Sequence, residues 1–233
     1  MKPTGLFSRG ALANHSPEAA RSLIGARLVR GSGPDARVGR IVEVEAYAGE
    51  ADLASHARFG RTKRNAVMFG RPGVAYVYLV YGMHHCLNVV TESEGRAAAV
   101  LIRSVEPVTG VAALRAERLR RALERADRRG PVAAARARKS IAALPDARLA
   151  AGPGLVCEAF SIDRADDGAD LCDPASELRL EVDSSDEPLP AVAASRIGIE
   201  YALEPWLSVQ WRFLVPGNPS LSSSRAGSVG SRG

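Results

Sequence analysis

Apolar and polar residues alternate along residues 40–47, which is the pattern of a β-strand with two different faces. One face carries Val42, Val44 and Ala46, and the other carries Glu43, Glu45 and Tyr47. The apolar face of such a strand packs on a core, while the opposite face most often meets solvent. The alternation alone therefore favours a solvated face for the two carboxylates. The less favoured alternative is that this face lines a catalytic site.

The same periodicity predicts further strands, and most of them are joined by short turns. We expect strands at residues 26–29, 75–80, 86–90 and 97–107, with segments 191–201 and 208–215 closing the sheet. The GSGP turn at 31–34 joins the first of these strands to residues 40–47 as a hairpin. Strands 75–80 and 86–90 form a second hairpin, whose tip carries Tyr81 and Met83. Large apolar side chains at an exposed tip indicate contact with a neighbouring element or a partner.

Helices are indicated by capping residues and by composition. Ser16, Pro17 and Glu18 match the N-cap, first position and first-turn acid of a helix that ends near Gly25. Residues 111–149 are rich in Ala, Arg and Leu and are interrupted at Gly130, which predicts two helices. Their basic surface is expected to be solvated rather than bound to nucleic acid.

These elements predict an α/β protein of the α+β type. We expect a single domain at residues 1–219, with a curved, mainly antiparallel sheet flanked by helices and a protruding β-hairpin. The Ser/Gly/Arg-rich segment 220–233 is expected to be a disordered tail.

Charge is distributed unevenly along the chain. The 31 Lys and Arg residues against 26 Asp and Glu give a formal charge of +5. Segment 57–72 contains five cations and no acid, namely Arg58, Arg61, Lys63, Arg64 and Arg71. A solvated loop is the common explanation, but such cations repel one another unless an anion lies among them. Segment 158–187 holds eleven acids against Arg164 and Arg179, so a nucleic acid should avoid that side.

Several classes of protein fit the sequence poorly. Cys86, Cys157 and Cys172 lack the spacing of a disulfide framework or a zinc site, which favours a reducing compartment. No run of about 18 apolar residues and no signal peptide is present, so we expect a cytoplasmic protein without a membrane partner. The phosphate-binding glycine motifs and the GxSxG and HExxH motifs are missing too. No cofactor and no metal are expected.

The candidate chemistry lies on the predicted strands and the loops that join them. It comprises Glu45, Tyr47, His56, Tyr78, Tyr81, Asn88 and Arg103. Aromatic rings with a carboxylate, a carboxamide and a cation suit a pocket that stacks a planar heterocycle, reads its edge and activates a water. Each residue also has a structural explanation, since a lone loop histidine, a strand asparagine and strand tyrosines are commonly packing residues.

Four longer motifs carry a resemblance to a known family. They are GRIVEVEAYAGEADLASHA, RTKRNAVMFGRPGVAYVYLVYGMHHCLNVV, AAVLIRSVEP and AAGPGLVCEAFSI. In this order, across residues 16–222, the chain closely resembles the 3-methyladenine (alkyladenine) DNA glycosylases of the mammalian-type fold. The resemblance implies base excision repair: a monomeric enzyme that flips alkylated or deaminated purines out of damaged double-stranded DNA and hydrolyses the N-glycosidic bond. A bacterial member would be associated with the nucleoid.

The resemblance also implies a role for individual residues. Glu45 matches the general base, and Arg103 matches the arginine that helps to hold the attacking water. Tyr47, His56 and Tyr78 match the residues that sandwich and hydrogen-bond the flipped base, and Asn88 matches the residue that disfavours guanine. Tyr81 matches the intercalating wedge. Contacts to the DNA backbone are expected from Arg61, Thr62, Lys63 and Arg64.

Other features limit or qualify this interpretation. The Glu45 strand and the tyrosine hairpin contain no lysine, which argues against a Schiff-base lyase and for simple hydrolysis to an abasic site. Lys63 stands where the family usually has proline, and Leu155 stands where it usually has Lys or Arg. Glu43 is expected to be solvated or at most to support Glu45. The alternative function is a non-catalytic module that binds damaged nucleic acid through the same pocket and hairpin.

Overall fold

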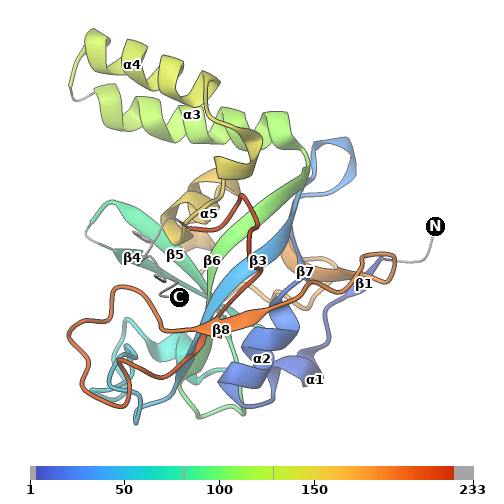
Figure 1. Ribbon diagram of the computed structural model, residues 1–233, viewed down its shortest axis with the longest axis vertical. Coiled ribbons are helices and arrows are strands. Elements are labelled where there is room, and N and C mark those ends of the chain that lie inside the picture. The colour runs from blue at the N-terminus through green and yellow to red at the C-terminus, as the bar shows by residue number, and fades with distance from the viewer. Residues whose placement is uncertain (1–3, 81, 128, 223–233) are drawn as a thin grey trace, which may run out of the picture.

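The chain folds around one antiparallel sheet that runs through the middle of the molecule (Figure 1). The computed structural model describes residues 4–80, 82–127 and 129–222. The strands are β1 (Thr4–Leu6), β2 (Arg27–Arg30), β3 (Arg37–Ala48), β4 (Ala75–Val80), β5 (His84–Val90), β6 (Ala98–Thr109), β7 (Leu178–Asp183), β8 (Val192–Ala194) and β9 (Arg212–Leu214). Their order is β1, β7, β2, β3, β6, β5, β4, and β9 and β8 extend the sheet from β3. Every pairing is antiparallel, as predicted.

Strand β3 is paired along both of its edges. One edge pairs with β6 from Val38 to Ala48, and the other pairs with β2 at its start and with β9 from Glu43 to Glu45. Both carboxylates therefore lie in the interior of the sheet, and both residues are 0% exposed. The solvated face that the alternation favoured is wrong, because residues from the far end of the chain lie against the carboxylates: Ile197 contacts Glu45, and Arg212 and Ser222 contact Glu43.

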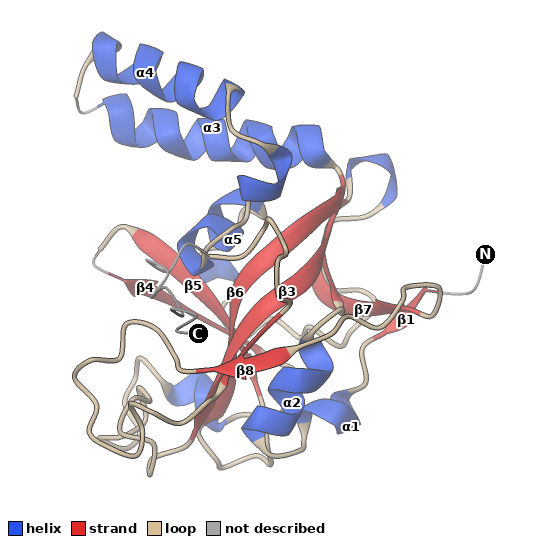
Figure 2. Ribbon diagram, viewed as in Figure 1, coloured by secondary structure: helices blue, strands red, loops and turns tan. Residues whose placement is uncertain are grey.

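Helices cover the sheet and extend beyond it (Figure 2). They are α1 (Arg9–Leu12), α2 (Ser16–Leu23), α3 (Val111–Asp127), α4 (Pro131–Ala142) and α5 (Pro153–Ala159). The pair α1 and α2 lies at one end of the sheet, and the antiparallel pair α3 and α4 projects from the other end (Figure 1). Helix α5 packs on β5, β6 and α3, so it connects the sheet to the projecting pair.

Several predicted elements differ from those observed. Ser16 begins α2 but does not cap it, because its hydroxyl contacts Glu92 and Thr91 instead. Segments 191–201 and 208–215 contain only the three-residue strands β8 and β9. Strands β1 and β7 and helices α1 and α5 were not predicted, since each is short and lacks a long periodic pattern.

Several aspartates of the acid-rich segment 158–187 are neutralised by ion pairs. Its aspartates pair with arginines from distant parts of the chain, as in Arg27 with Asp186, Arg30 with Asp166 and Arg9 with Asp170. Asp170 also pairs with Arg71, at 2.6 Å. Arg71 is therefore not an unpaired cation of the basic loop.

Two predicted features lie wholly or partly outside the described residues. Tyr81, the proposed wedge, is one of them, and residues 223–233 of the predicted tail are the other. The first residues of that tail are part of the fold: Ser220 is fully buried and the backbone of Ser222 donates a hydrogen bond to Glu43. Within the described ranges, no helix has both the length and the apolar character to cross a membrane.

Candidate functional site

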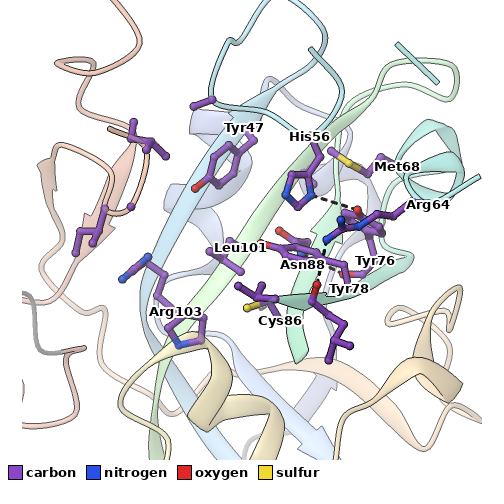
Figure 3. A pocket seen from close by; sticks show the side chains of 18 of the residues that line it. Tyr47, His56, Arg64, Met68, Tyr76, Tyr78, Cys86, Asn88, Leu101 and Arg103 are labelled. Atoms are coloured by element: carbon purple, nitrogen blue, oxygen red, sulfur yellow. Dashed lines mark hydrogen bonds between the residues drawn. The ribbon is translucent and has the colours of Figure 1, made fainter. Parts of the chain in front are cut away.

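A cavity of about 600 Å³ opens beside β3, between the β4–β5 hairpin and the loop at residues 197–201 (Figure 3). Its lining includes residues from both hairpin strands, from β6 and from the loop that follows β3. Six predicted site residues line it, namely Tyr47, His56, Arg64, Tyr78, Asn88 and Arg103, whereas Glu45 is fully buried and is not part of the lining. The structure therefore brings together side chains that are spread over more than fifty positions of the sequence.

Arg103 is placed by an irregularity in the sheet. Glu43 pairs with Ser104 and Val44 pairs with Ile102, so Arg103 is an extra residue on β6. A bulge of this kind re-aims a side chain out of the regular alternation. Its Nε lies 3.0 Å from Glu43 Oε1 and its Nη1 lies 3.1 Å from Glu45 Oε1. One guanidinium thus joins the two carboxylates.

Glu43 is the most heavily hydrogen-bonded member of this group. Besides Arg103, it accepts hydrogen bonds from Arg212, from the hydroxyl of Ser104 and from both the backbone and the hydroxyl of Ser222. Burial alone raises the pKa of a carboxyl, but the Arg103 charge and these donors outweigh it and hold the pKa of Glu43 below its ordinary value. The expectation that Glu43 is solvated is wrong. Glu43 is a buried anion that contacts and supports Arg103.

Glu45 has a donor on each carboxylate oxygen. The backbone N–H of Ile197 donates to Oε1 over 2.8 Å, and the hydroxyl of Tyr47 donates to Oε2 over 2.8 Å. Burial acts to lower the pKa of Arg103, but Glu45 and Glu43 outweigh it and hold that pKa above its ordinary value. The guanidinium beside Glu45 is therefore a permanent positive charge.

Tyr47 is held by a buried ion pair behind its ring. The guanidinium of Arg196 lies 4.8 Å from the ring centroid and donates to both oxygens of Asp52. Both charged side chains are 0% exposed. Asp52 also accepts hydrogen bonds from the backbone of Ala48 and Ala54. Burial and the Glu45 carboxylate raise the pKa of Tyr47 well above its ordinary value, so its hydroxyl remains a donor.

Three rings form the opposite side of the cavity, apart from Tyr47 (Figure 3). His56 and Tyr78 meet edge to face with centroids 4.4 Å apart, and His56 Nδ1 lies 3.2 Å from the hydroxyl of Tyr76. Loss of solvent, with the charges of Arg64 and Arg58, lowers the pKa of His56 to about 4. Burial raises the pKa of Tyr76 to about 12. Both rings are neutral near pH 7, so His56 presents one acceptor and one donor nitrogen.

Asn88 faces the cavity from β5 in a fixed orientation. Its amide donates to the carbonyl of Tyr76 over 3.1 Å, and the residue is only 4% exposed. Cys86 lies two residues before it, and burial raises the pKa of its thiol to about 11. The carboxamide is therefore a polar group on a wall that is otherwise aromatic and apolar.

The basic loop is organised by an asparagine. Asn65 is 2% exposed, accepts hydrogen bonds from the backbone and hydroxyl of Thr62, and donates to the carbonyls of His56 and Gly60. The side chains of Arg61, Lys63 and Arg64 are exposed. Arg64 also reaches the carbonyl of Leu79 over 3.0 Å, so one predicted backbone contact is tied to the hairpin.

Some functional residues could not be found from spacing. Asp52 and Arg196 lie 144 positions apart, and Asn65 resembles any loop asparagine in the sequence. Glu43 had a signal, its place two residues before Glu45, but the alternation assigned both to a solvated face. Among the described residues, no group of three or more His, Cys, Asp or Glu side chains is arranged to hold a metal ion.

This chain is similar to known proteins over nearly its whole length. A family model described as "Methylpurine-DNA glycosylase (MPG)" matches residues 11–219. A protein of Methanocella arvoryzae is 45% identical over 213 residues, covering 91% of this chain and 93% of its own. A protein of Myxococcus xanthus is 42% identical over 216 residues, covering 91% and 89%. Both carry the name "Putative 3-methyladenine DNA glycosylase". The chain belongs to the methylpurine-DNA glycosylase family.

Proposed function

We propose that this protein is a monofunctional 3-methyladenine DNA glycosylase that takes an alkylated purine into the cavity and hydrolyses its N-glycosidic bond. One observation carries the proposal: the buried carboxylate of Glu45 contacts both Tyr47 and Arg103, and these two residues line a cavity with aromatic rings. A carboxylate fixed by a permanent cation next to a base-sized cavity is the arrangement that base hydrolysis needs.

The cavity suits a purine taken out of the DNA helix. Tyr47 stands on one side and the rings of His56 and Tyr78 stand on the other, so a flipped base has an aromatic surface on both faces. Stacking of a base on an aromatic side chain is worth about 1–3 kcal/mol. Alkylation at N3 or N7 gives the purine a positive charge, which strengthens its attraction to electron-rich rings. The same charge makes the base a good leaving group.

Glu45 is proposed to activate the attacking water. Its Oε2 accepts one hydrogen bond, from Tyr47, and a carboxylate oxygen has a second lone pair for a water. The negative charge also favours the positive charge that develops on the sugar as the bond breaks. Arg103 acts on this group as a positioning residue, since its contacts to Glu43 and Glu45 fix the carboxylate and the bulged strand.

Discrimination between bases is assigned to Asn88 and His56. The Asn88 carboxamide is held by Tyr76, so it cannot turn away from a purine that carries a 2-amino group. A neutral His56 can hydrogen-bond the edge of a neutral lesion, which makes hypoxanthine and ethenoadenine proposed substrates besides 3-methyladenine. These finer preferences follow from hydrogen bonding rather than from charge.

The DNA is proposed to approach along the basic loop and the tip of the β4–β5 hairpin. The exposed side chains of Arg61, Lys63 and Arg64 and the turn at Thr62 are the proposed contacts to phosphates. Tyr81, which lies between β4 and β5 in the sequence, is proposed as the wedge that fills the space left by the flipped base. None of the described residues that line the cavity is a lysine, which supports hydrolysis without a Schiff base.

A base-release assay tests the proposal. Duplexes that carry a single 3-methyladenine, 7-methylguanine, hypoxanthine or ethenoadenine are incubated with the protein at a stated salt concentration, and free base and abasic sites are measured. We expect release of 3-methyladenine, an abasic product and an uncut strand. Tight binding of the same duplexes without any release would instead support the non-catalytic binding module.

A further inference from the structure

A second cavity lies on the other side of the hairpin tip from the base pocket. It has a volume of about 330 Å³ and is lined by Gly82, Met83, Arg121, Glu124, Arg125 and Arg129. Gly82 also lines the first cavity, so the two cavities adjoin at the hairpin tip. We propose that this second cavity, the arginine groove, binds the sugar-phosphate backbone of the duplex whose lesion occupies the base pocket. The inference rests on the proposed function, and it replaces, for this face of α3, the expectation that the basic helix surface is only solvated.

Three regularly spaced arginines line one wall of the groove. Arg121, Arg125 and Arg129 are four residues apart, a spacing that places side chains on one face of a helix. Arg121 and Arg125 lie in α3, and Arg129 follows its end. All three line the cavity with Gly82 and Met83, so the face of α3 that carries Arg121 and Arg125 is turned toward the hairpin tip.

Positive charge exceeds negative charge in this groove. Arg121 pairs with Asp163 at 3.4 Å and lies 3.9 Å from Glu124, which also pairs with Arg120. Arg125 shares the single carboxylate of Glu158 with Arg118. Arg129 is exposed, and no side-chain partner is found for it among the described residues. The excess positive charge therefore lies on Arg129 and on the pair Arg118 and Arg125, which have one carboxylate between them.

Glu158 also lies between α3 and the start of β5. This buried carboxylate of α5 contacts Arg118 and Arg125 of α3 and lies 3.4 Å from Nδ1 of His84, at the start of β5. Gly154 of α5 approaches the same histidine so closely that an added Cβ would lie 3.1 Å from its Cβ. Helix α5 therefore contacts both α3 and the first residue of β5.

A phosphate backbone fits this chemistry better than a protein surface does. Arginine binds phosphate oxygens through two parallel N–H groups, and a row of arginines one helical turn apart follows a chain of anions. Met83, which is 62% exposed, adds an apolar contact at the hairpin tip. A duplex opened at this tip has its backbone on both sides of it, and the groove occupies the side away from the base pocket.

The salt dependence of DNA binding tests the groove without requiring catalysis. Affinity for a fluorescein-labelled undamaged duplex is measured by anisotropy over a series of salt concentrations, for the wild type and for Arg121→Gln/Arg129→Gln. The matched control is Arg136→Gln/Arg138→Gln, which removes the same charge from α4, away from the groove lining. Each phosphate contact contributes about 0.9 to the slope of log affinity against log salt.

We expect the groove variant to lower the magnitude of that slope by about 0.9 to 1.8 and the control to leave it within error of the wild type. Equal slopes for the wild type and the groove variant, or equal losses in both variants, would overturn the proposal. The proposed function fails separately: a protein that releases no base can still show the slope change, and a protein that releases base can lack it.

Discussion

The hydroxyl of Tyr47 lies 2.8 Å from Oε2 of Glu45 and donates a hydrogen bond to it. The residue proposed to stack the flipped base therefore also holds the carboxylate proposed to activate water. Behind the same ring lies Arg196, whose neighbour Ile197 donates to the other oxygen of Glu45. Base binding and water activation are thus built on one connected set of contacts.

Substitution of Tyr47 separates its two contributions. Tyr47→Phe keeps the ring and loses a hydrogen bond to a charged acceptor, a contact worth about 1.5–3 kcal/mol. We expect the single-turnover rate of 3-methyladenine release to fall about tenfold in this variant. Tyr47→Ala also loses the stacking surface, and we expect a further loss of about tenfold or more. Equal rates for the two variants would show that the ring contributes nothing.

Arg103 is expected to be required for stability as well as for activity. Arg103→Gln leaves two buried carboxylates without their shared cation, and breaking a buried pair in this way costs about 3–5 kcal/mol. The measurement is urea unfolding at pH 7. Arg120→Gln is the control, because its pairs with Glu117 and Glu124 are exposed and such pairs are worth at most about 1 kcal/mol. Similar losses in both variants would contradict the description of the carboxylate pair.

The buried pair of Arg196 and Asp52 should behave as one unit. Arg196→Met leaves Asp52 as an unpaired buried carboxylate, and we expect a loss of about 3–5 kcal/mol in the free energy of unfolding. Adding Asp52→Asn to Arg196→Met removes the unpaired charge and should recover part of the lost free energy of unfolding. A double-mutant cycle measures the coupling, which we expect to exceed about 1 kcal/mol. Additive losses would mean that the two side chains do not stabilise each other.

His56 should make stability depend on pH in the acid range. Its pKa falls from 6.5 to about 4 in the folded protein, so the unfolded chain binds more protons between these two values. Protonation of His56 in the unfolded chain therefore costs no stability above pH 6.5, and it lowers the free energy of unfolding as the pH falls toward 4. His56→Gln removes this dependence and leaves that of all other groups. Parallel stability curves for the wild type and this variant between pH 4 and 7 would rule out this contribution of His56.

The sequence was sufficient for the longer elements and the candidate residues. Strands β4, β5 and β6 and helices α3 and α4 have long, consistent patterns, and they lie close to where they were predicted. Tyr47, His56, Tyr78, Asn88 and Arg103, which the family motifs indicated, line one cavity, and the buried Glu45 contacts two of them. Periodicity succeeds here because a long run of alternating residues has few alternative structures.

The burial of Glu43 and Glu45 could not be predicted in the same way. It depends on β9, a three-residue strand some 170 positions away, and on Arg103, which a bulge in the neighbouring strand β6 turns toward the two carboxylates. The support of Tyr47 by Arg196 and Asp52 is likewise a contact between distant segments. Such contacts are decided by tertiary packing and leave no local pattern.

The central claim is that Glu45 activates the water that releases the base, and Glu45→Gln tests it most directly. The amide keeps the size of the side chain and can still accept from Tyr47, but it cannot take a proton. The measurement is single-turnover release of hypoxanthine and 3-methyladenine from duplex DNA, with the affinity for the same duplexes measured alongside. We expect affinity within about threefold of the wild type and release slower by about a hundredfold or more. Release at the wild-type rate with unchanged affinity would contradict the mechanism.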